Sequence, residues 1–298
     1  SDLYQEAGER MEEAICHGNI GIVLQRLGQY LEAQNYHEKC LKIRHEIGNK
    51  DGEASSYCNL GTVFLDLGEY TEARGYFERA IEIVVKTGDK LVEAKCYRNL
   101  GNVFQHLSKY RKAQDYYQKA LFIEQEIGYK KGEAACYGNQ GNLFQRYGDY
   151  AKARDYYEKA IIIQQEIGDI NGEATSYDGL GTVYQFLGDY AKAKDYYGKA
   201  VAIRQKLGHR IGEASSHLNS GTLFQFQGKY FKAKDHYEKA LAIAQEIGAR
   251  KEEALCRGNL GTVFKHLGEY VKAKDYYEKA LAIHNEMGNR GDRKSTRL

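Results

Sequence analysis

The sequence predicts an all-α protein built as an α-solenoid, in which short helices pair and the pairs stack. The chain repeats every 40 residues, without insertion or deletion, over seven copies from Met11 to Arg290. Glycine occupies two fixed positions in every copy, and apolar residues recur between them at helical spacing. A repeat of this length indicates stacked supersecondary units rather than one globule. The glycines are Gly21, Gly61, Gly101, Gly141, Gly181, Gly221 and Gly261 at the first position, and Gly48, Gly88, Gly128, Gly168, Gly208, Gly248 and Gly288 at the second.

The elements follow in chain order from this period. Residues 1–10 align with the end of a later unit, so we expect them to close the second helix of a preceding repeat. Seven units then occupy residues 11–50, 51–90, 91–130, 131–170, 171–210, 211–250 and 251–290. Residues 291–298 fit no column of the repeat, and we interpret them as a non-repeat tail that arose as a sequencing artefact. We therefore expect the chain to be a fragment of a longer protein.

Each unit is predicted to form two helices. In the second unit the apolar spacing predicts a first helix over Gly52–Leu67 and a second over Tyr70–Thr87. Gly68 and Gly88 suit the left-handed conformation that ends a helix. Asp89 is suited to cap the N-terminus of the next helix.

Gly61 and its equivalents fall in the middle of the first helix, where glycine costs about 1 kcal/mol relative to alanine. A close approach between helices explains why every unit keeps it. Small residues on the second helix, at Ala73 and Ala80, favour the same tight packing. One unit cannot bury both faces of its helices, so the units must stack to be stable.

These columns resemble the tetratricopeptide repeat (TPR), through the pattern Tyr57, Leu60-Gly61, Phe64, Ala73, Phe77, Ala80 and its equivalents in all seven units. Two features depart from the family pattern: proline is absent, and the period is 40 rather than 34 residues. The 40-residue unit looks like that of Pins/LGN polarity adaptors, and also like long metazoan arrays that end in a CHAT domain. The resemblance implies a right-handed superhelix of antiparallel helix pairs. It also implies that the first helices line a concave groove that holds an extended peptide.

An asparagine column in the first helix is the leading candidate for backbone recognition. The resemblance places the peptide-contacting asparagine of the family here, and a side-chain amide both donates and accepts hydrogen bonds. The alternative is that these amides bond within the array and bridge neighbouring helices. The column contains Asn19, Asn59, Asn99, Asn139, Asn219 and Asn259, with Gly179 as its exception.

Variable residues of the same helices are predicted to set specificity. Cations occur in the first, third and fourth units, against Asp66 in the second, whereas phenylalanines occupy the fifth and sixth. We therefore hypothesise a two-part groove that suits a peptide with acidic residues beside an apolar anchor. The alternative is that the charges are only solvated and the phenylalanines pack locally. The candidates are Arg26, Lys95, Arg98, Asn102, Asn142 and Arg146, then Phe186, Phe226 and Lys265.

A dicarboxylate clamp for chaperone tails is predicted to be absent. Arg98, Asn102 and Asn139 begin to match its pattern, but Thr175 and Gly179 occupy the positions where its cations belong.

Composition and motifs exclude several other classes. The 43 Lys and Arg nearly balance the 41 Asp and Glu, whereas nucleic-acid binding needs a clustered basic surface. No apolar run approaches the roughly 20 residues of a membrane span. No phosphate-binding, metal-binding or catalytic motif occurs, and the cysteines and histidines form no motif. We expect no cofactor, no metal and no enzymatic activity, and a cytoplasmic location.

The sequence leaves three functions open. The leading one is an adaptor that binds partner peptides. The first alternative is the regulatory array of a larger protein whose effector domain, possibly CHAT-like, lies outside this chain. The second alternative is a structural spacer without a groove ligand.

Overall fold

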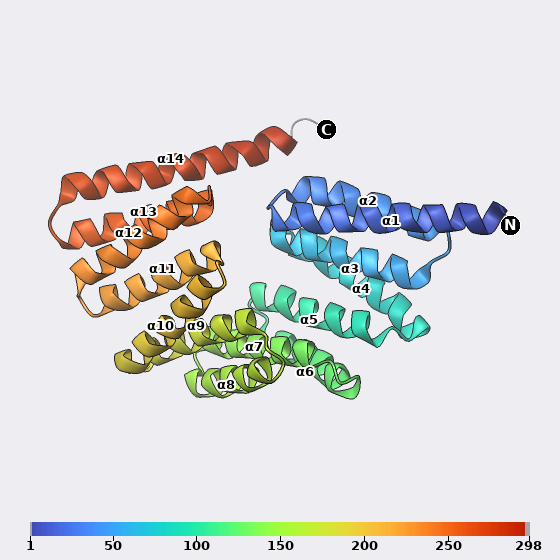
Figure 1. The fold of residues 1–298 in the computed structure, drawn as a ribbon, viewed down its shortest axis with the longest axis horizontal. Coiled ribbons are helices and arrows are strands. Elements are labelled where there is room, and N and C mark those ends of the chain that lie inside the picture. Colours follow the sequence, from blue (N-terminus) through green and yellow to red (C-terminus); the bar gives the residue numbers. More distant parts are fainter. Residues whose placement is uncertain (1, 296–298) are drawn as a thin grey trace. The chain divides into compact units, whose positions relative to one another are not determined.

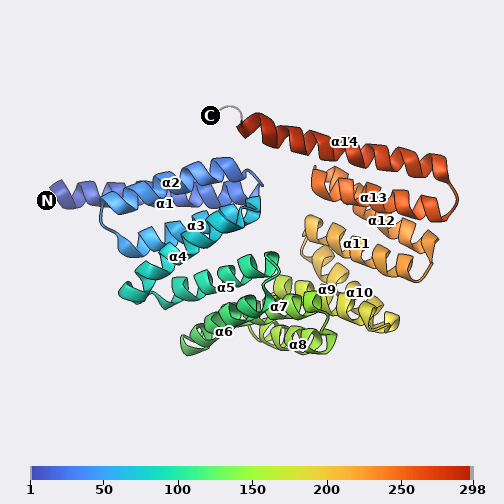
Figure 2. The same cartoon turned by 180° about the vertical axis from the view of Figure 1, so that it is seen from behind.

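The computed structural model describes residues 2–295, with side chains from residue 8 to residue 286. These residues form fourteen α-helices and no strand. The chain is an all-α TPR-like solenoid, and it divides into two compact units, residues 1–149 and 150–298. From here on, a unit is one of these two halves, and each 40-residue copy is called a repeat. Figures 1 and 2 show that within each unit the helices stack in chain order.

Helices alternate between a first and a second helix of each repeat. In the first unit the first helices are α1 (Asp2–Arg26), α3 (Lys50–Leu67), α5 (Lys90–His106) and α7 (Lys130–Tyr147). Its second helices are α2 (Tyr30–Glu46), α4 (Tyr70–Thr87) and α6 (Tyr110–Glu126). The second unit contains α8 (Tyr150–Glu166), α9 (Ile170–Phe186), α10 (Tyr190–Lys206), α11 (Arg210–Phe226), α12 (Tyr230–Glu246), α13 (Arg250–His266) and α14 (Tyr270–Ser295).

The predicted helix boundaries of the second repeat are confirmed to within two residues. Gly68 and Gly88 end their helices in the left-handed conformation, with φ of 83° and 88°. The Asp89 side chain accepts a hydrogen bond of 3.1 Å from the Val92 amide, as a helix N-cap does. Ser108 replaces glycine at the turn equivalent to Gly68 and still adopts a positive φ of 56°.

Two glycines at the ends of the array do not form turns: Gly288 of the second glycine column, and Gly8, which lies 40 residues before Gly48. Gly8 lies within α1 and Gly288 within α14, both in helical conformation. At both positions the helix continues, so the backbone groups that a turn would leave unpaired stay within the helical hydrogen-bond pattern. The assignment of residues 1–10 to a preceding repeat stays a prediction. Residues 296–298 of the predicted tail lie outside the described residues.

The mid-helix glycines are explained by aromatic rings of the second helix. A Cβ atom on Gly101 would lie 2.3 Å from the Tyr117 ring, and one on Gly61 would lie 2.7 Å from the Phe77 ring. No side chain larger than hydrogen fits there, because real Cβ contacts are longer. Close approach is therefore confirmed at six of these glycines, Gly21, Gly61, Gly101, Gly181, Gly221 and Gly261, and the approaching group is a ring rather than the helix backbone.

Candidate functional site

The first helices line the inner side of each stack. Along the first unit α1 contacts α3, α3 contacts α5, and α5 contacts α7, and in the second unit α9 contacts α11 and α11 contacts α13. Within each of the two units, the described residues of no second helix contact the second helix of the next repeat. The second helices therefore diverge on the outer side, while the first helices converge. This arrangement agrees with the family expectation that first helices form the inner wall.

The asparagine column lies half-buried along the contacts between first helices, apart from the exposed Asn19. Asn59 accepts a hydrogen bond of 3.2 Å from Lys95 in the next repeat, and the Asn99 amide lies 3.4 Å from the Thr62 hydroxyl in the previous one. Asn219 donates to the carboxylate of Asp178 in the preceding repeat. The helix-bridging alternative therefore describes part of what these amides do. One amide offers several donor and acceptor positions, so a single bridge leaves capacity for a ligand.

Gly179 interrupts the asparagine column where an aromatic ring lies close to its backbone. A Cβ atom at this position would lie 2.4 Å from the ring of Tyr157 in the preceding repeat. An asparagine here would therefore require the Tyr157 ring to move.

Arg98 is held inside the stack by an ion pair. Its guanidinium contacts the carboxylate of Glu124 on α6, and the two side chains are 18% and 1% exposed. The thiol of Cys136 on α7 donates to the other oxygen of Glu124 over 2.9 Å. The Arg98 charge is therefore already neutralised by the protein, and this geometry does not support its predicted role as a groove cation.

The fifth repeat carries the same ion pair with its charges exchanged. Asp178 of α9 occupies the position of Arg98, and Arg204 of α10 occupies that of Glu124. Arg204 also donates to the backbone carbonyl of Gly212 over 3.0 Å and contacts the hydroxyl of Ser216. Burial raises the pKa of Asp178, and Arg204 opposes this. The third and fifth repeats therefore share a buried ion pair between their two helices, with the positive charge on the first helix in the third repeat and on the second helix in the fifth.

Sequence reasoning missed these buried partners because it examined single columns. The signal was present in pairs of residues 26 apart, which carry opposite charges in the third and fifth repeats. The second and sixth repeats have apolar residues at both positions, Cys58 with Val84 and Leu218 with Ala244.

The remaining predicted polar residues differ in how exposed they are. Lys95 is half-buried and bonded to Asn59, and Asn102 accepts a hydrogen bond of 2.7 Å from the Tyr117 hydroxyl. Exposed positions hold Arg26, Asn142, Arg146, Lys265 and, in the asparagine column, Asn19. Asn139 and Asn259 are half-buried. Arg146 lies close enough to His106 to help lower the pKa of that imidazole, after burial.

Two exposed phenylalanines meet at the ends of the first helices in the second unit. Phe186 and Phe226 are 52% and 60% exposed, and their ring centroids are 6.5 Å apart. Tyr150 stacks on Phe186 with a centroid distance of 5.1 Å. The structure therefore brings the two predicted aromatic residues together. Tyr150 supports the Phe186 ring by stacking, and both phenylalanines remain exposed to solvent.

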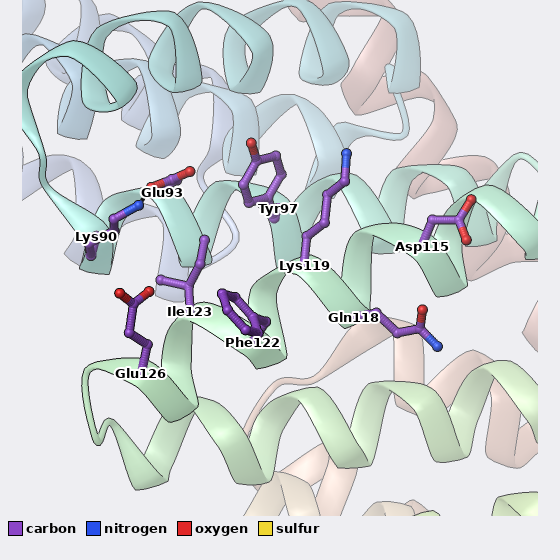
Figure 3. A pocket seen from close by; sticks show the side chains of 9 residues that line it. All are labelled: Lys90, Glu93, Tyr97, Asp115, Gln118, Lys119, Phe122, Ile123 and Glu126. Carbon is purple, nitrogen blue, oxygen red and sulfur yellow. Dashed lines mark hydrogen bonds and ion pairs between the residues drawn. The ribbon is translucent and has the colours of Figure 1, made fainter.

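A different groove lies between α5 and α6, with a volume of about 680 Å³. Figure 3 shows Tyr97 and Lys119 side by side there, and the Lys119 ammonium lies 5.6 Å from the Tyr97 ring centroid. Lys90 donates to Glu93 over 2.9 Å, and the equivalent pair Lys130–Glu133 recurs in the next repeat. None of the residues lining this groove belongs to the predicted set, and its charges follow the general pattern of the array.

The described residues hold no cluster of three or more side chains that would ligate a metal ion. Among the same residues, no helix combines the length and apolar character that crossing a bilayer requires. Cys96, Cys136 and Cys256 are buried, as expected of packing residues, whereas Cys16 of the same column is exposed.

Known proteins share both the repeat and the fold. The tetratricopeptide-repeat family model matches residues 12–84, 52–126, 92–166, 132–206 and 212–286. No curated protein matches the sequence. The BtubC structure from P. vanneervenii is 25% identical with a TM-score of 0.60, over 74% of this chain and 90% of its own.

Two further solved structures show the same fold at lower identity. A Rap conjugation gene regulator in complex with a Phr peptide is 16% identical, with a TM-score of 0.70 over 92% of this chain and 74% of its own. A signal transduction ATPase with a tetratricopeptide repeat sensor, from Pyrococcus horikoshii, is 20% identical, with a TM-score of 0.69 over 94% of this chain and 44% of its own. The family model covers most of the sequence, and the helix pairs have the matching architecture. The chain therefore belongs to the tetratricopeptide-repeat family.

Proposed function

We propose that this chain is a non-enzymatic scaffold that binds an extended peptide of a partner protein along the inner side of its first helices. The observation that carries the proposal is the Phe186–Phe226 pair, because adjacent exposed aromatic rings mark interaction surfaces. The fold is also that of a regulator whose structure contains a bound peptide.

The polar groups beside the aromatic pair suit a backbone ligand. Asn219 and Thr222 are half-buried on α11, the helix that carries Phe226. The Thr222 hydroxyl donates its one proton to the Leu218 carbonyl over 3.0 Å. The Asn219 amide also bonds within the array, to Asp178, but it has a second N–H and a carbonyl oxygen, so it is the better candidate to meet a peptide group. An apolar side chain of the ligand would pack on the two rings. The exposed cations Arg146 and Lys265 would favour acidic residues in a ligand that reaches either of them.

The test begins with the selection of peptides from a displayed library against the full chain. The selected peptides are then synthesised, and calorimetric titration measures their affinity for the chain. We expect peptides with an aromatic or large aliphatic residue near acidic ones. Phe226→Ala should weaken binding by about tenfold or more, since anchor residues contribute about 2 kcal/mol or more.

Phe122→Ala provides a matched control, because Phe122 is 70% exposed but lies in the groove between α5 and α6. It should leave the affinity unchanged. Selection of no peptide, or equal affinity for Phe186→Ala, Phe226→Ala and the unmodified chain, would reject the groove and favour a spacer.

A regulatory array within a larger protein is the second candidate, and the likeness to the tetratricopeptide repeat sensor of a signal transduction ATPase favours it. The sequence of the full-length transcript would distinguish a regulatory array from an adaptor. A downstream Cys/His protease-like domain would support a CHAT-type effector, whereas GoLoco-type motifs would support a Pins/LGN-like adaptor.

A further inference from the structure

The sixth repeat departs from the array at an aromatic contact that recurs on the outer side of other repeats. In three other repeats two tyrosine rings meet there, as in Tyr57–Tyr76 with centroids 6.2 Å apart, and in the first repeat His17 meets Tyr36. The sixth repeat has His217 and His236 instead, with centroids 5.4 Å apart and their Nδ1 atoms 3.2 Å apart. Two imidazoles therefore replace two phenols at the same place. The tyrosine pairs are Tyr57–Tyr76, Tyr97–Tyr116 and Tyr177–Tyr196.

Two further exceptions lie around the same histidines. Gly198 on α10 occupies a column that is Glu in five repeats and Gln in the other, and Ser220 on α11 occupies a column that is mainly Leu. Together with the histidines they line a cavity of about 240 Å³ between α10, α11 and α12. Nothing lies within 4 Å of a Cβ atom placed on Gly198, so the missing side chain leaves open space.

The cavity combines apolar walls with one polar end. Val201, Leu223 and Phe224 contribute apolar surface, and the two histidines contribute polar groups together with Ser220, Lys194 and Gln205. The Nδ1–Nδ1 hydrogen bond needs one proton between the rings. In the neutral pair one Nε2 therefore carries a proton and the other does not, so the pair offers both a donor and an acceptor.

The charges around the pair favour an anion. Lys194 of α10 lines the cavity, and Lys239 of α12 lies close enough to lower the pKa of both histidines. On α11, Glu213 faces His217, but its carboxylate is bound by Arg210 over 2.7 Å and by Gln205 over 3.0 Å. On α12, Asp235 partly offsets Lys239 at His236. No carboxylate lines the cavity itself, since Gly198 stands where other repeats carry Glu.

We propose that this cavity binds a carboxylate carried on an apolar group, with the apolar part against Leu223 and Phe224 and the carboxylate at the His217–His236 pair. The site lies on the outer side of the stack, and none of its lining residues belongs to the inner groove. Its existence is therefore independent of the peptide-binding proposal.

Protonation gives the site a distinctive pH dependence. Burial, then His217 and Lys239, lower the pKa of His236 to about 4, so the empty pair is neutral at pH 7. A bound carboxylate stabilises the imidazolium form and raises this pKa. By linkage, carboxylate affinity increases as the pH falls from 7.5 to 5.5, by up to about tenfold for each unit that the pKa rises. A neutral ligand of the same shape gains nothing from this proton.

The experiment titrates the full chain with 3-phenylpropionate and with its neutral amide, and follows the imidazole signals of both histidines by NMR. We expect the carboxylate to move both signals and to bind at least about tenfold more tightly at pH 5.5 than the amide. Two short peptides then separate the sources of the carboxylate. One ends in a free Phe carboxylate, and the other has an amidated end and an internal Glu beside Phe.

Gly198→Glu is the matched variant, because it restores the carboxylate of the other repeats. It should raise the pKa of His236 from about 4 towards its ordinary range without any ligand, and should abolish binding of 3-phenylpropionate. The double variant H217Y/H236Y, which restores the tyrosine pair, should also lose binding while keeping the helical circular dichroism. Equal binding of acid and amide, no movement of the histidine signals, or an unchanged pKa in a folded Gly198→Glu protein would each overturn the proposal.

Discussion

At the scale of single residues, left-handed backbone conformation ends most helices of the array. Twelve glycines adopt positive φ, all at helix ends, and Ser108 is the single non-glycine residue that does so among the described residues. A left-handed conformation costs a side chain with a Cβ atom roughly 1–2 kcal/mol. Ser108 is strained because its turn geometry is set by the helices on either side.

Ser108→Gly should therefore stabilise the protein. We expect a gain of about 1 kcal/mol, since removal of the Cβ atom relieves strain but adds chain entropy to the unfolded state. Urea unfolding followed by circular dichroism measures the change. Gly148→Ser makes the reverse change at the equivalent turn, where φ is 86°, and should destabilise the protein. A lower midpoint for Ser108→Gly would contradict the argument.

At the scale of the helix pair, the repeats share one backbone but differ in the polar contact that joins their two helices. The third repeat has Arg98–Glu124, the fifth has the reversed Asp178–Arg204, and the second has the small apolar pair Cys58 and Val84. Burial of a charge is costly without its partner, whereas exchange of the whole pair for apolar residues is nearly neutral. The second and third repeats therefore contain two solutions of one packing problem.

We predict that Glu124→Val alone costs about 3 kcal/mol, because Arg98 is left without its partner inside the stack. The double variant R98C/E124V reproduces the pair of the second repeat and should recover most of that loss. Chemical unfolding of the single and double variants measures the coupling. A double variant no more stable than Glu124→Val would show that the two positions do not form an interchangeable unit.

The helix pairs were predictable from sequence, whereas their interior contacts were not. Helix ends followed from glycine columns such as Gly68 and Gly88, since turn conformation is a local property of the chain. The aromatic pair Phe186–Phe226 was predicted from one column and is observed as a contact. Arg98 was predicted to line the groove as a variable cation of its first helix, but its long side chain contacts Glu124, which lies 26 residues away. Such choices depend on which partner is nearest in space, and one column does not contain that information.

At the scale of the whole molecule, stability is distributed along the chain through neighbouring contacts. Within each unit, the described residues of every helix contact only helices one or two places away in chain order. The energetics of such an array approximate a sum of repeat terms and nearest-neighbour terms. A local defect should therefore loosen its own neighbourhood in the stack before it affects distant repeats.

Gly101→Ala tests this locality in the first unit. Its Cβ atom would lie 2.3 Å from the Tyr117 ring, and such overpacking costs roughly 1–3 kcal/mol. Native-state hydrogen exchange should accelerate in α4–α7, the helices that pack around this contact, while protection in α1 and α2 persists. Gly258→Ala is the control, because nothing lies within 4 Å of the added Cβ atom and alanine favours the helix by about 1 kcal/mol. Uniform loss of protection from α1 to α7 in Gly101→Ala would instead show that the unit opens as one cooperative body.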